Sequence, residues 1–223
     1  MERSELVRLY PVLFHMAEDG TWPSIRANGL LSTRAIVDLF DPAATVRTSI
    51  LGSVRSKPVV IEHPQHGYAV IRDQAPLKFL DQCLTEGTAA QDYLNALNER
   101  VFFWLSFTRL RRLLDAKRYR NNAATVIHVD TARLLACHAD TVQLAPYNTG
   151  SMHVPSAPRR GTDVFVDVDR YPHDRWQAMR GKGADAVVEL TVRYQVKDIG
   201  DLTRRVERWV GGSPVDVLYD ADR

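Results

Sequence analysis

VLFHMAEDGTWPSIRANGLLS, residues 12–32, is the stretch of the sequence that carries the most information about the fold. Residues 12–16 form a short apolar run with one polar member, His15, which is typical of a strand. Thr21 then marks a helix start, because threonine is a favourable N-cap residue. Gly29 stands where a helix C-terminus favours a left-handed residue. The stretch therefore predicts a strand followed by a short helix.

The rest of the chain mixes strand and helix patterns without regular alternation, which favours an α+β fold. No glycine-rich dinucleotide fingerprint or phosphate loop is present, which argues against a conventional nucleotide-binding fold. Residues 147–160, rich in Gly, Pro and Ser, are expected to form a long loop. Further strands are expected at 58–62, 68–72, 101–105, 125–129, 142–144 and 186–192, and helices at 4–10, 35–40, 77–84, 89–97, 108–119 and 131–136.

Length and composition indicate one globular domain spanning residues 1–223, with 45% hydrophobic and 25% charged residues. Cys83 and Cys137 have no metal-type or redox spacing, so we expect two buried thiols in a reducing compartment. Without a signal-like or membrane-spanning apolar run, the sequence predicts a cytoplasmic protein that makes no contact with a membrane.

The charge balance is nearly even, with a formal net charge of +2, and by itself predicts no polyanionic partner. The basic residues are nevertheless clustered, at 109–120 and again at 204–208. Such clusters are either solvated helix faces or phosphate-binding surfaces, and the sequence leaves both interpretations open.

Three segments contain residues that could carry chemistry: 14–32 with His15, 101–106 with the sequence VFFWLS, and 187–191 with the sequence VVELT. Each also has an ordinary structural interpretation. A histidine in a strand is commonly a hydrogen-bonded core residue, and an aromatic run is commonly core. Strand alternation places Glu189 opposite Val188 and Leu190, so its carboxylate could face water.

Taken together, the three segments resemble the ADP-ribosyltransferase superfamily. The strand histidine, the short helix and Gly-Leu-Leu-Ser at 29–32 are similar to the entry segment of DNA-modifying DarT toxins and of RNA 2′-phosphotransferases. The spacing matches over residues 12–32, whereas 101–109 and 184–194 match only in character. The resemblance implies a split mixed sheet with flanking helices, NAD as the substrate and no metal.

The resemblance also implies roles for individual residues. Glu189 is expected to be the catalytic carboxylate, which stabilises the positive charge that develops on the ribose as the N-glycosidic bond breaks. The residues expected to bind NAD are His15 at a ribose hydroxyl, Met16 at the nicotinamide amide, Ser32, Phe103 or Trp104 as a stacking ring, and Arg47 or Arg55 at the pyrophosphate.

The acceptor of the ADP-ribose is expected to contact Asn148, Ser151 and Arg160 in the long loop. Protein-modifying relatives often carry a Glu-X-Glu pair, but Val187 stands two residues before Glu189. This departure favours DNA, RNA or a nucleotide over a protein arginine as the acceptor. The resemblance further implies a bacterial toxin or defence effector with an antitoxin partner. An NAD glycohydrolase and a non-catalytic nucleotide-binding module of the same fold remain the alternatives.

Overall fold

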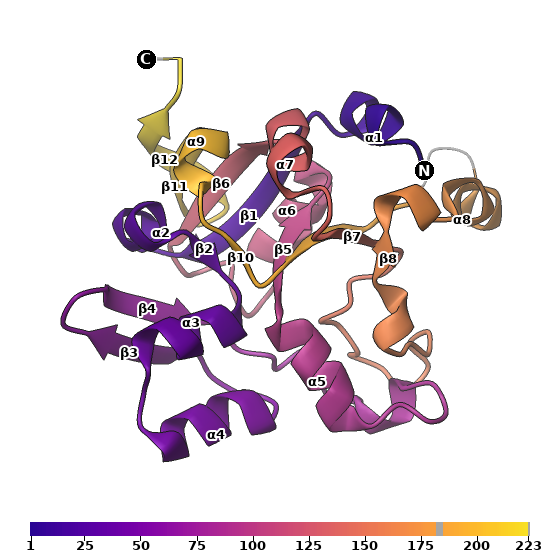
Figure 1. The fold of residues 1–223 in the computed structure, drawn as a ribbon, viewed down its shortest axis with the longest axis horizontal. Helices are drawn as coiled ribbons and strands as arrows, with labels where there is room; N and C mark the ends of the chain where they lie inside the picture. The colour runs from indigo at the N-terminus through magenta and orange to yellow at the C-terminus, as the bar shows by residue number, and fades with distance from the viewer. Residues whose placement is uncertain (182–184, 223) are drawn as a thin grey trace.

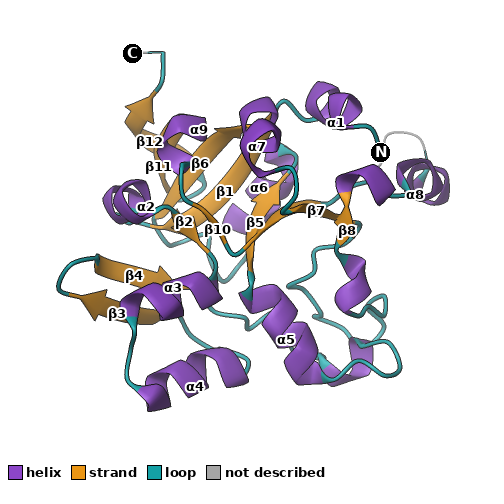
Figure 2. Ribbon diagram, viewed as in Figure 1, coloured by secondary structure: helices purple, strands orange, loops and turns teal. Residues whose placement is uncertain are grey.

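The computed structural model describes residues 1–181 and 185–222, which form an α+β structure around one large sheet (Figure 1). The sheet has eight strands in the order β12-β11-β6-β1-β5-β9-β7-β8. Two further pairs, β10 with β2 and β3 with β4, lie beside it. Figure 2 shows the helices distributed around this central sheet.

The strands are β1 (Val12–Glu18), β2 (Leu30–Leu31), β3 (Val59–His63), β4 (Gly67–Ile71), β5 (Arg100–Trp104), β6 (Ala124–Asp130), β7 (Val142–Ala145), β8 (Val166–Asp167), β9 (Glu189–Arg193), β10 (Gln195–Val196), β11 (Thr203–Val210) and β12 (Ser213–Asp220). The α-helices are α1 (Arg3–Leu9), α2 (Trp22–Asn28), α3 (Thr33–Phe40), α4 (Ala44–Gly52), α5 (Ala90–Asn98), α6 (Phe107–Leu114), α7 (Thr131–His138), α8 (His173–Arg180) and α9 (Ile199–Leu202). Short 3-10 turns occur at Asp81–Cys83, Thr162–Val164 and Val168–Arg170.

The large sheet is almost divided between β1 and β5. The register of this pair contains one matched position, Phe14 with Trp104. By contrast, β1 and β6 are matched at seven positions, and β5 and β9 at five. The two halves of the sheet are therefore joined at one point, and beyond it β1 and β5 are not paired.

Helices cover the two faces of the sheet and bury separate apolar clusters. One face packs against Leu6 of α1, Leu134 of α7 and Leu202 of α9. In a second cluster, Leu110 and Leu114 of α6 pack with apolar residues of β1, β6 and β11. Burial of these side chains stabilises the sheet by roughly 1.5–3 kcal/mol for each large residue. None of the helices in the described ranges has the length and apolar character needed to cross a bilayer.

Two smaller clusters build the regions that flank the split. In one, α3 and α4 pack with the β3–β4 hairpin through residues such as Phe40, Ile50 and Ile71. In the other, α5 packs against the segment around Met152 and Phe165. Figure 1 shows the α3, α4 and hairpin group on one side and α5 beside it, both below the large sheet.

The α+β class, the strand at the start of residues 12–32, the helix that ends at Gly29 and the hairpin after residue 58 are confirmed. The prediction of a mixed sheet was wrong, because every pairing between the named strands in the described residues is antiparallel. Cys83 is buried as expected, but Cys137 is exposed because it lies on the outer side of α7.

One helix was not predicted from the sequence, and two predicted helices were wrong in extent or type. Helix α4 forms in a weakly patterned stretch, because Ile50 and Leu51 become buried against the α3 and hairpin group. The helix expected over 77–84 is reduced to a single 3-10 turn. The basic helix expected over 108–119 ends at Leu114, where its apolar face also ends, so Arg120 does not continue that helix.

Gly29 provides a test of the entry segment. Its φ is +90°, and a Cβ atom there would lie 2.8 Å from the Lys197 Cα atom beside β10. We expect Gly29→Ala to lower the free energy of unfolding by about 2 kcal/mol or more, because both the backbone angle and the close approach oppose a side chain. Chemical denaturation measures this change.

The control is Gly52→Ala at the end of α4, where no atom lies within 4 Å of the added carbon. Alanine there should be neutral or stabilising by up to about 1 kcal/mol. Equal stability of the two variants would contradict the placement of Gly29 against β10.

Candidate functional site

A cavity of about 690 Å³ opens where the sheet splits. Its wall includes residues of both β1 and β5, together with parts of α2, α3, β4, α6 and the loop at 148–153. A cavity of this volume is in the range that binds small molecules and nucleotides. The split in the sheet therefore provides the space in which the sequence-predicted residues can meet.

His15 lies at the split and replaces a missing backbone partner of β5. Its Nδ1 atom is 2.8 Å from the carbonyl oxygen of Phe102. Because a carbonyl can only accept, Nδ1 carries the proton and Nε2 remains an acceptor. Burial lowers the pKa of His15 to about 4, so the ring is neutral at pH 7. The site thus contains a neutral imidazole with one unprotonated nitrogen.

Glu189 is the first residue of β9, paired with Trp104 on one side and Ala145 on the other. Its side chain is buried, in contrast to the solvent-facing alternative that strand alternation leaves open. Oε2 accepts hydrogen bonds from the backbone N–H of Thr149 at 3.0 Å and from its hydroxyl at 2.6 Å. Burial raises the pKa of Glu189 to about 7, while the Thr149 bonds and the nearby Arg160 oppose this rise.

His15 and Glu189 both line the cavity, as the sequence-based hypothesis requires. They come from strands on opposite sides of the split, one from β1 and one from β9 beyond β5. A buried carboxylate with a pKa near neutrality in a cavity is a recognised mark of a functional site.

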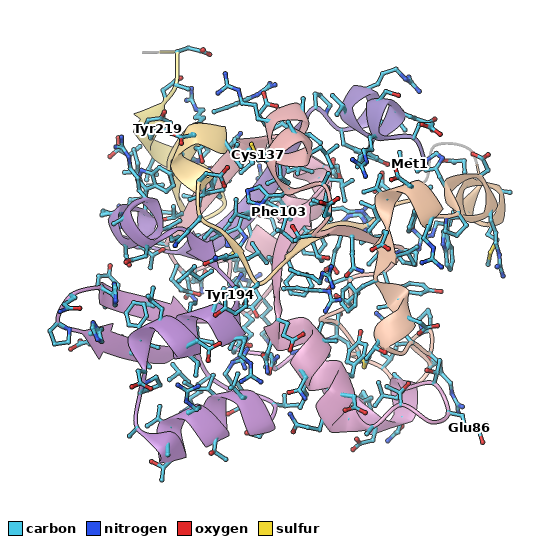
Figure 3. The ribbon with its side chains drawn as sticks, viewed as in Figure 1. Met1, Glu86, Phe103, Cys137, Tyr194 and Tyr219 are labelled. Carbon is cyan, nitrogen blue, oxygen red and sulfur yellow. The ribbon has the colours of Figure 1, made fainter. Side chains whose placement is uncertain are left out.

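The other residues expected to bind NAD divide between cavity and core. Met16, Ser32 and Trp104 line the cavity. The Ser32 hydroxyl also caps α3, where it accepts a hydrogen bond from the Ala35 N–H at 3.1 Å. Phe103 does not line the cavity: the residue is 1% exposed and belongs to the main apolar cluster, near the centre of the molecule in Figure 3. Because neighbouring strand residues point to opposite faces, only Trp104 of this pair can offer a ring to a ligand.

Arg47 lies outside the cavity, which corrects one of the two pyrophosphate assignments. Its guanidinium is half-buried on α4 and pairs with Asp38 and Asp41, each at 3.0 Å. These pairings hold α4 against the end of α3.

Arg55 lines the cavity, but its guanidinium is committed to the protein. It donates to the carbonyls of Arg72 and Ile50, to the Asn98 side chain and to the Thr33 hydroxyl, over distances of 2.8–3.4 Å. A guanidinium has five N–H groups, so four of its donors are used. A bidentate grip on a pyrophosphate is therefore incompatible with this arrangement, and Arg55 joins the segments that build the wall.

The long loop contributes two of its three expected residues. Asn148 and Ser151 line the cavity. Arg160 does not: it is 4% exposed and donates to the carbonyls of Asn148 at 2.7 Å and Pro158 at 3.0 Å. Its guanidinium also lies 4.9 Å above the Tyr147 ring. Arg160 thus secures the loop from within instead of presenting a charge to an acceptor.

The cavity wall is positively charged, a property that local motifs do not reveal. Seven lining residues are cationic and three are carboxylates, so the wall favours an anionic ligand. The cations are Arg55, Arg72, Arg100, Arg109, Arg112, Lys117 and Arg118, and the carboxylates are Glu18, Asp73 and Glu189.

Several of these cations already have acidic partners. The Arg109 Nε atom lies 2.6 Å from Asp185 Oδ2, and the Arg118 Nε atom lies 3.1 Å from Asp73 Oδ1. Within the described residues, the side chains of Arg112 and Lys117 form no ion pair or hydrogen bond, and both residues are exposed at the cavity edge. In the sequence, the only indication that these two residues could contact a ligand was their membership of the basic stretch at 109–120. The stretch did not distinguish them from Arg111, which pairs with Asp115 away from the cavity.

Thr149 is a further residue that sequence reasoning did not single out, since no motif distinguishes it from the other polar residues of its loop.

Among the described residues, no group of His, Cys, Asp or Glu side chains is arranged to hold a metal ion.

The raised pKa of Glu189 predicts a pH-dependent cost to stability. In the folded protein the carboxyl binds its proton more tightly than at its ordinary value of 4.5. The penalty for ionisation is therefore absent below pH 4.5 and complete above about pH 7. We expect Glu189→Gln to stabilise the protein at pH 8.5 by about 1–3 kcal/mol, which thermal unfolding would show as a Tm rise of several degrees.

At pH 4 the two proteins should unfold at nearly the same temperature, because Glu189 is then protonated in both the folded and the unfolded state. Glu86→Gln is the matched control, since Glu86 is exposed at the periphery of the molecule (Figure 3). A stability difference that is constant between pH 4 and pH 8.5 would contradict a buried carboxyl whose pKa lies near 7.

Comparison with known proteins identifies a family whose function is unknown. No curated protein matches the chain. One family model, described as a family of unknown function (DUF7002), matches residues 11–203. The match extends from the start of β1 to the first residue of β11 and so includes both strands of the split, the long loop and Glu189. The chain therefore belongs to the DUF7002 family.

Proposed function

We propose that the protein is an NAD-dependent ADP-ribosyltransferase with an ADP-ribosyltransferase-like fold, acting on a nucleic acid or a nucleotide. The observation that carries the proposal is that His15 and Glu189 both line one cavity at the split of the sheet. The basic wall supports the same conclusion, because NAD and nucleotide acceptors are anionic.

The cavity residues fit the chemical groups of NAD. The unprotonated Nε2 of His15 can accept a hydrogen bond from a ribose hydroxyl. Trp104 offers an aromatic surface for a flat ring, and Met16 contributes the strand edge beside it. These donors, acceptors and rings match the roles that the resemblance implies for them.

Glu189 supplies the charge that such a reaction needs. In ADP-ribose transfer, the bond between ribose C1′ and the nicotinamide nitrogen breaks, and its electron pair leaves with nicotinamide. Positive charge then builds on the ribose until the acceptor atom bonds to C1′ and loses its proton. A buried carboxylate beside that ribose stabilises the charge more strongly than it would in water. Only the ionised form of Glu189 serves this purpose.

Glu189→Gln should lower the rate of nicotinamide release from NAD by about 10²–10³-fold, because the amide keeps the shape and loses the charge. The measurement is nicotinamide formation by chromatography, with DNA, RNA, nucleotides and protein offered as acceptors and adducts identified by mass spectrometry. In the wild type, kcat/KM should rise as the pH passes through about 7, the pKa of Glu189.

Glu86→Gln should retain wild-type activity. Equal rates for the Glu189→Gln variant and the wild type would remove Glu189 from the mechanism. Free ADP-ribose without any adduct would indicate an NAD glycohydrolase. If the wild type consumes no NAD with any of the acceptors offered, the proposed function is contradicted and a non-catalytic binding module is favoured.

The unpaired cations at the cavity edge test the class of acceptor. If Arg112 and Lys117 contact phosphates of an oligonucleotide, kcat/KM for its modification should fall steeply with salt. In Arg112→Gln/Lys117→Gln the slope of log rate against log salt should become shallower by about 1.5, since each lost phosphate contact removes about 0.7–0.9. NAD hydrolysis without an acceptor should change little.

Arg111→Gln is the control, because Arg111 neighbours Arg112 on α6 but pairs with Asp115 outside the cavity. This variant should keep the wild-type slope. A reaction that is independent of salt, or labelling confined to protein, would overturn the nucleic-acid assignment and leave the NAD-cleaving one intact.

A further inference from the structure

Thr149 differs from its neighbours in the long loop. Asn148, Gly150 and Ser151 all line the cavity, whereas Thr149 between them is fully buried. Its side chain turns inward to Glu189, and both of its donors are directed to the same carboxylate oxygen. The loop therefore forms one part of the cavity wall and also anchors the carboxylate behind it.

The two oxygens of Glu189 are consequently in different environments. Oε2 accepts the N–H and O–H bonds of Thr149, at 3.0 and 2.6 Å. Oε1 accepts no hydrogen bond from the described residues, and it is not among the fully buried atoms that lack a partner. Oε1 therefore retains accessible area, and because Glu189 lines the cavity, we infer that Oε1 is the oxygen that faces it. The carboxylate has one oxygen held by the protein and one available to a ligand.

Thr149 is itself held by two side chains from outside the loop's tip. The buried Tyr93 hydroxyl donates to the Thr149 carbonyl oxygen at 3.0 Å. The Arg160 guanidinium donates to the neighbouring Asn148 carbonyl oxygen at 2.7 Å. With its carbonyl and the preceding one both occupied, the Thr149 backbone has little freedom to rotate, so its two donors remain directed at Oε2.

We propose that Thr149 is the positioning residue of Glu189: it fixes Oε2 through two donors so that Oε1 faces the substrate in the cavity. The inference rests on the function proposed above, in which Glu189 stabilises a developing positive charge. It assigns to the long loop an essential role in orienting the carboxylate, in addition to contact with an acceptor.

The electrostatic surroundings give this arrangement a measurable consequence. Glu189 is affected by Arg160 from the loop, by Arg109 from α6 and by the Tyr93 hydroxyl from α5, as well as by Thr149. The two bonds from Thr149 favour the ionised carboxylate, in opposition to burial. Removal of the hydroxyl alone should therefore make Glu189 a weaker acid, with the charged neighbours unchanged.

The test compares Thr149→Val, which removes the hydroxyl and keeps the volume, with Thr149→Ser, which keeps the hydroxyl. Glu189 is titrated by NMR of ¹³C-labelled carboxyl groups, with its signal assigned by its absence in Glu189→Gln. We expect the acid dissociation constant of Glu189 to fall about tenfold in Thr149→Val, as loss of one charge-assisted hydrogen bond requires. Thr149→Ser should titrate like the wild type.

Activity supplies the second readout. The pH at which kcat/KM for NAD cleavage is half-maximal should move upward in Thr149→Val by the same interval as the NMR titration, and Thr149→Ser should restore it. When Glu189→Gln is already present, Thr149→Val should cause no further loss, because the two residues act through one carboxylate. If the valine variant does not fold, Thr149→Ala removes the same hydroxyl without added bulk.

An unchanged Glu189 titration in the valine or alanine variant would overturn the proposal. So would an activity loss that Thr149→Ser does not rescue, or one that is undiminished when Glu189→Gln is present. The NMR titration requires no enzymatic turnover, so it decides the role of Thr149 even if the wild type does not cleave NAD. A wild type that does not cleave NAD would contradict only the proposed function.

Discussion

The single pairing of Phe14 with Trp104 is the constraint on which the rest of the structure depends. It joins two halves of a sheet and leaves the remaining backbone of β1 and β5 without partners in each other. Unpaired backbone groups inside a protein are costly, and the carbonyl of Phe102 is satisfied by the His15 ring instead of by a strand. His15 thereby stabilises the split, and the same bond determines which of its nitrogens remains available to a ligand.

The split also explains why a carboxylate can be buried in the middle of an apolar sheet. Glu189 lies beside Trp104, the residue at which the two halves meet, so its side chain adjoins the cavity and is not enclosed by a continuous sheet. Burial there opposes ionisation and costs stability at neutral pH. Such a cost, partly offset by the two bonds from Thr149, is characteristic of sites where function requires a charge in a dry environment.

The arginines around the cavity show how one residue type serves opposite purposes. Arg55 and Arg160 are buried, and their planar guanidinium groups connect carbonyls of segments that are distant in the sequence. Arg112 is exposed at the cavity edge and has no partner within the described residues. The first two maintain the shape of the wall, and the third gives the wall its available charge. Sequence context does not separate these roles, because the number of donors used is set by the surrounding fold.

The sequence alone determined the features that depend on local preference: the strand at residues 12–16, the helix that ends at Gly29, the hairpin after residue 58 and the α+β class. It also singled out His15 and Glu189, which the fold places in the wall of one cavity. Only the tertiary structure decided that Glu189 is buried, because strand alternation shows which residues share a face but not whether that face is covered. The tertiary structure also decided that Trp104 lines the cavity whereas Phe103 lies in the core. It likewise showed that Arg55 lines the cavity whereas Arg47 pairs with Asp38 outside it. Thr149 could not be found from the sequence, since its two donors acquire their meaning only when the fold brings a loop residue against a strand forty positions away.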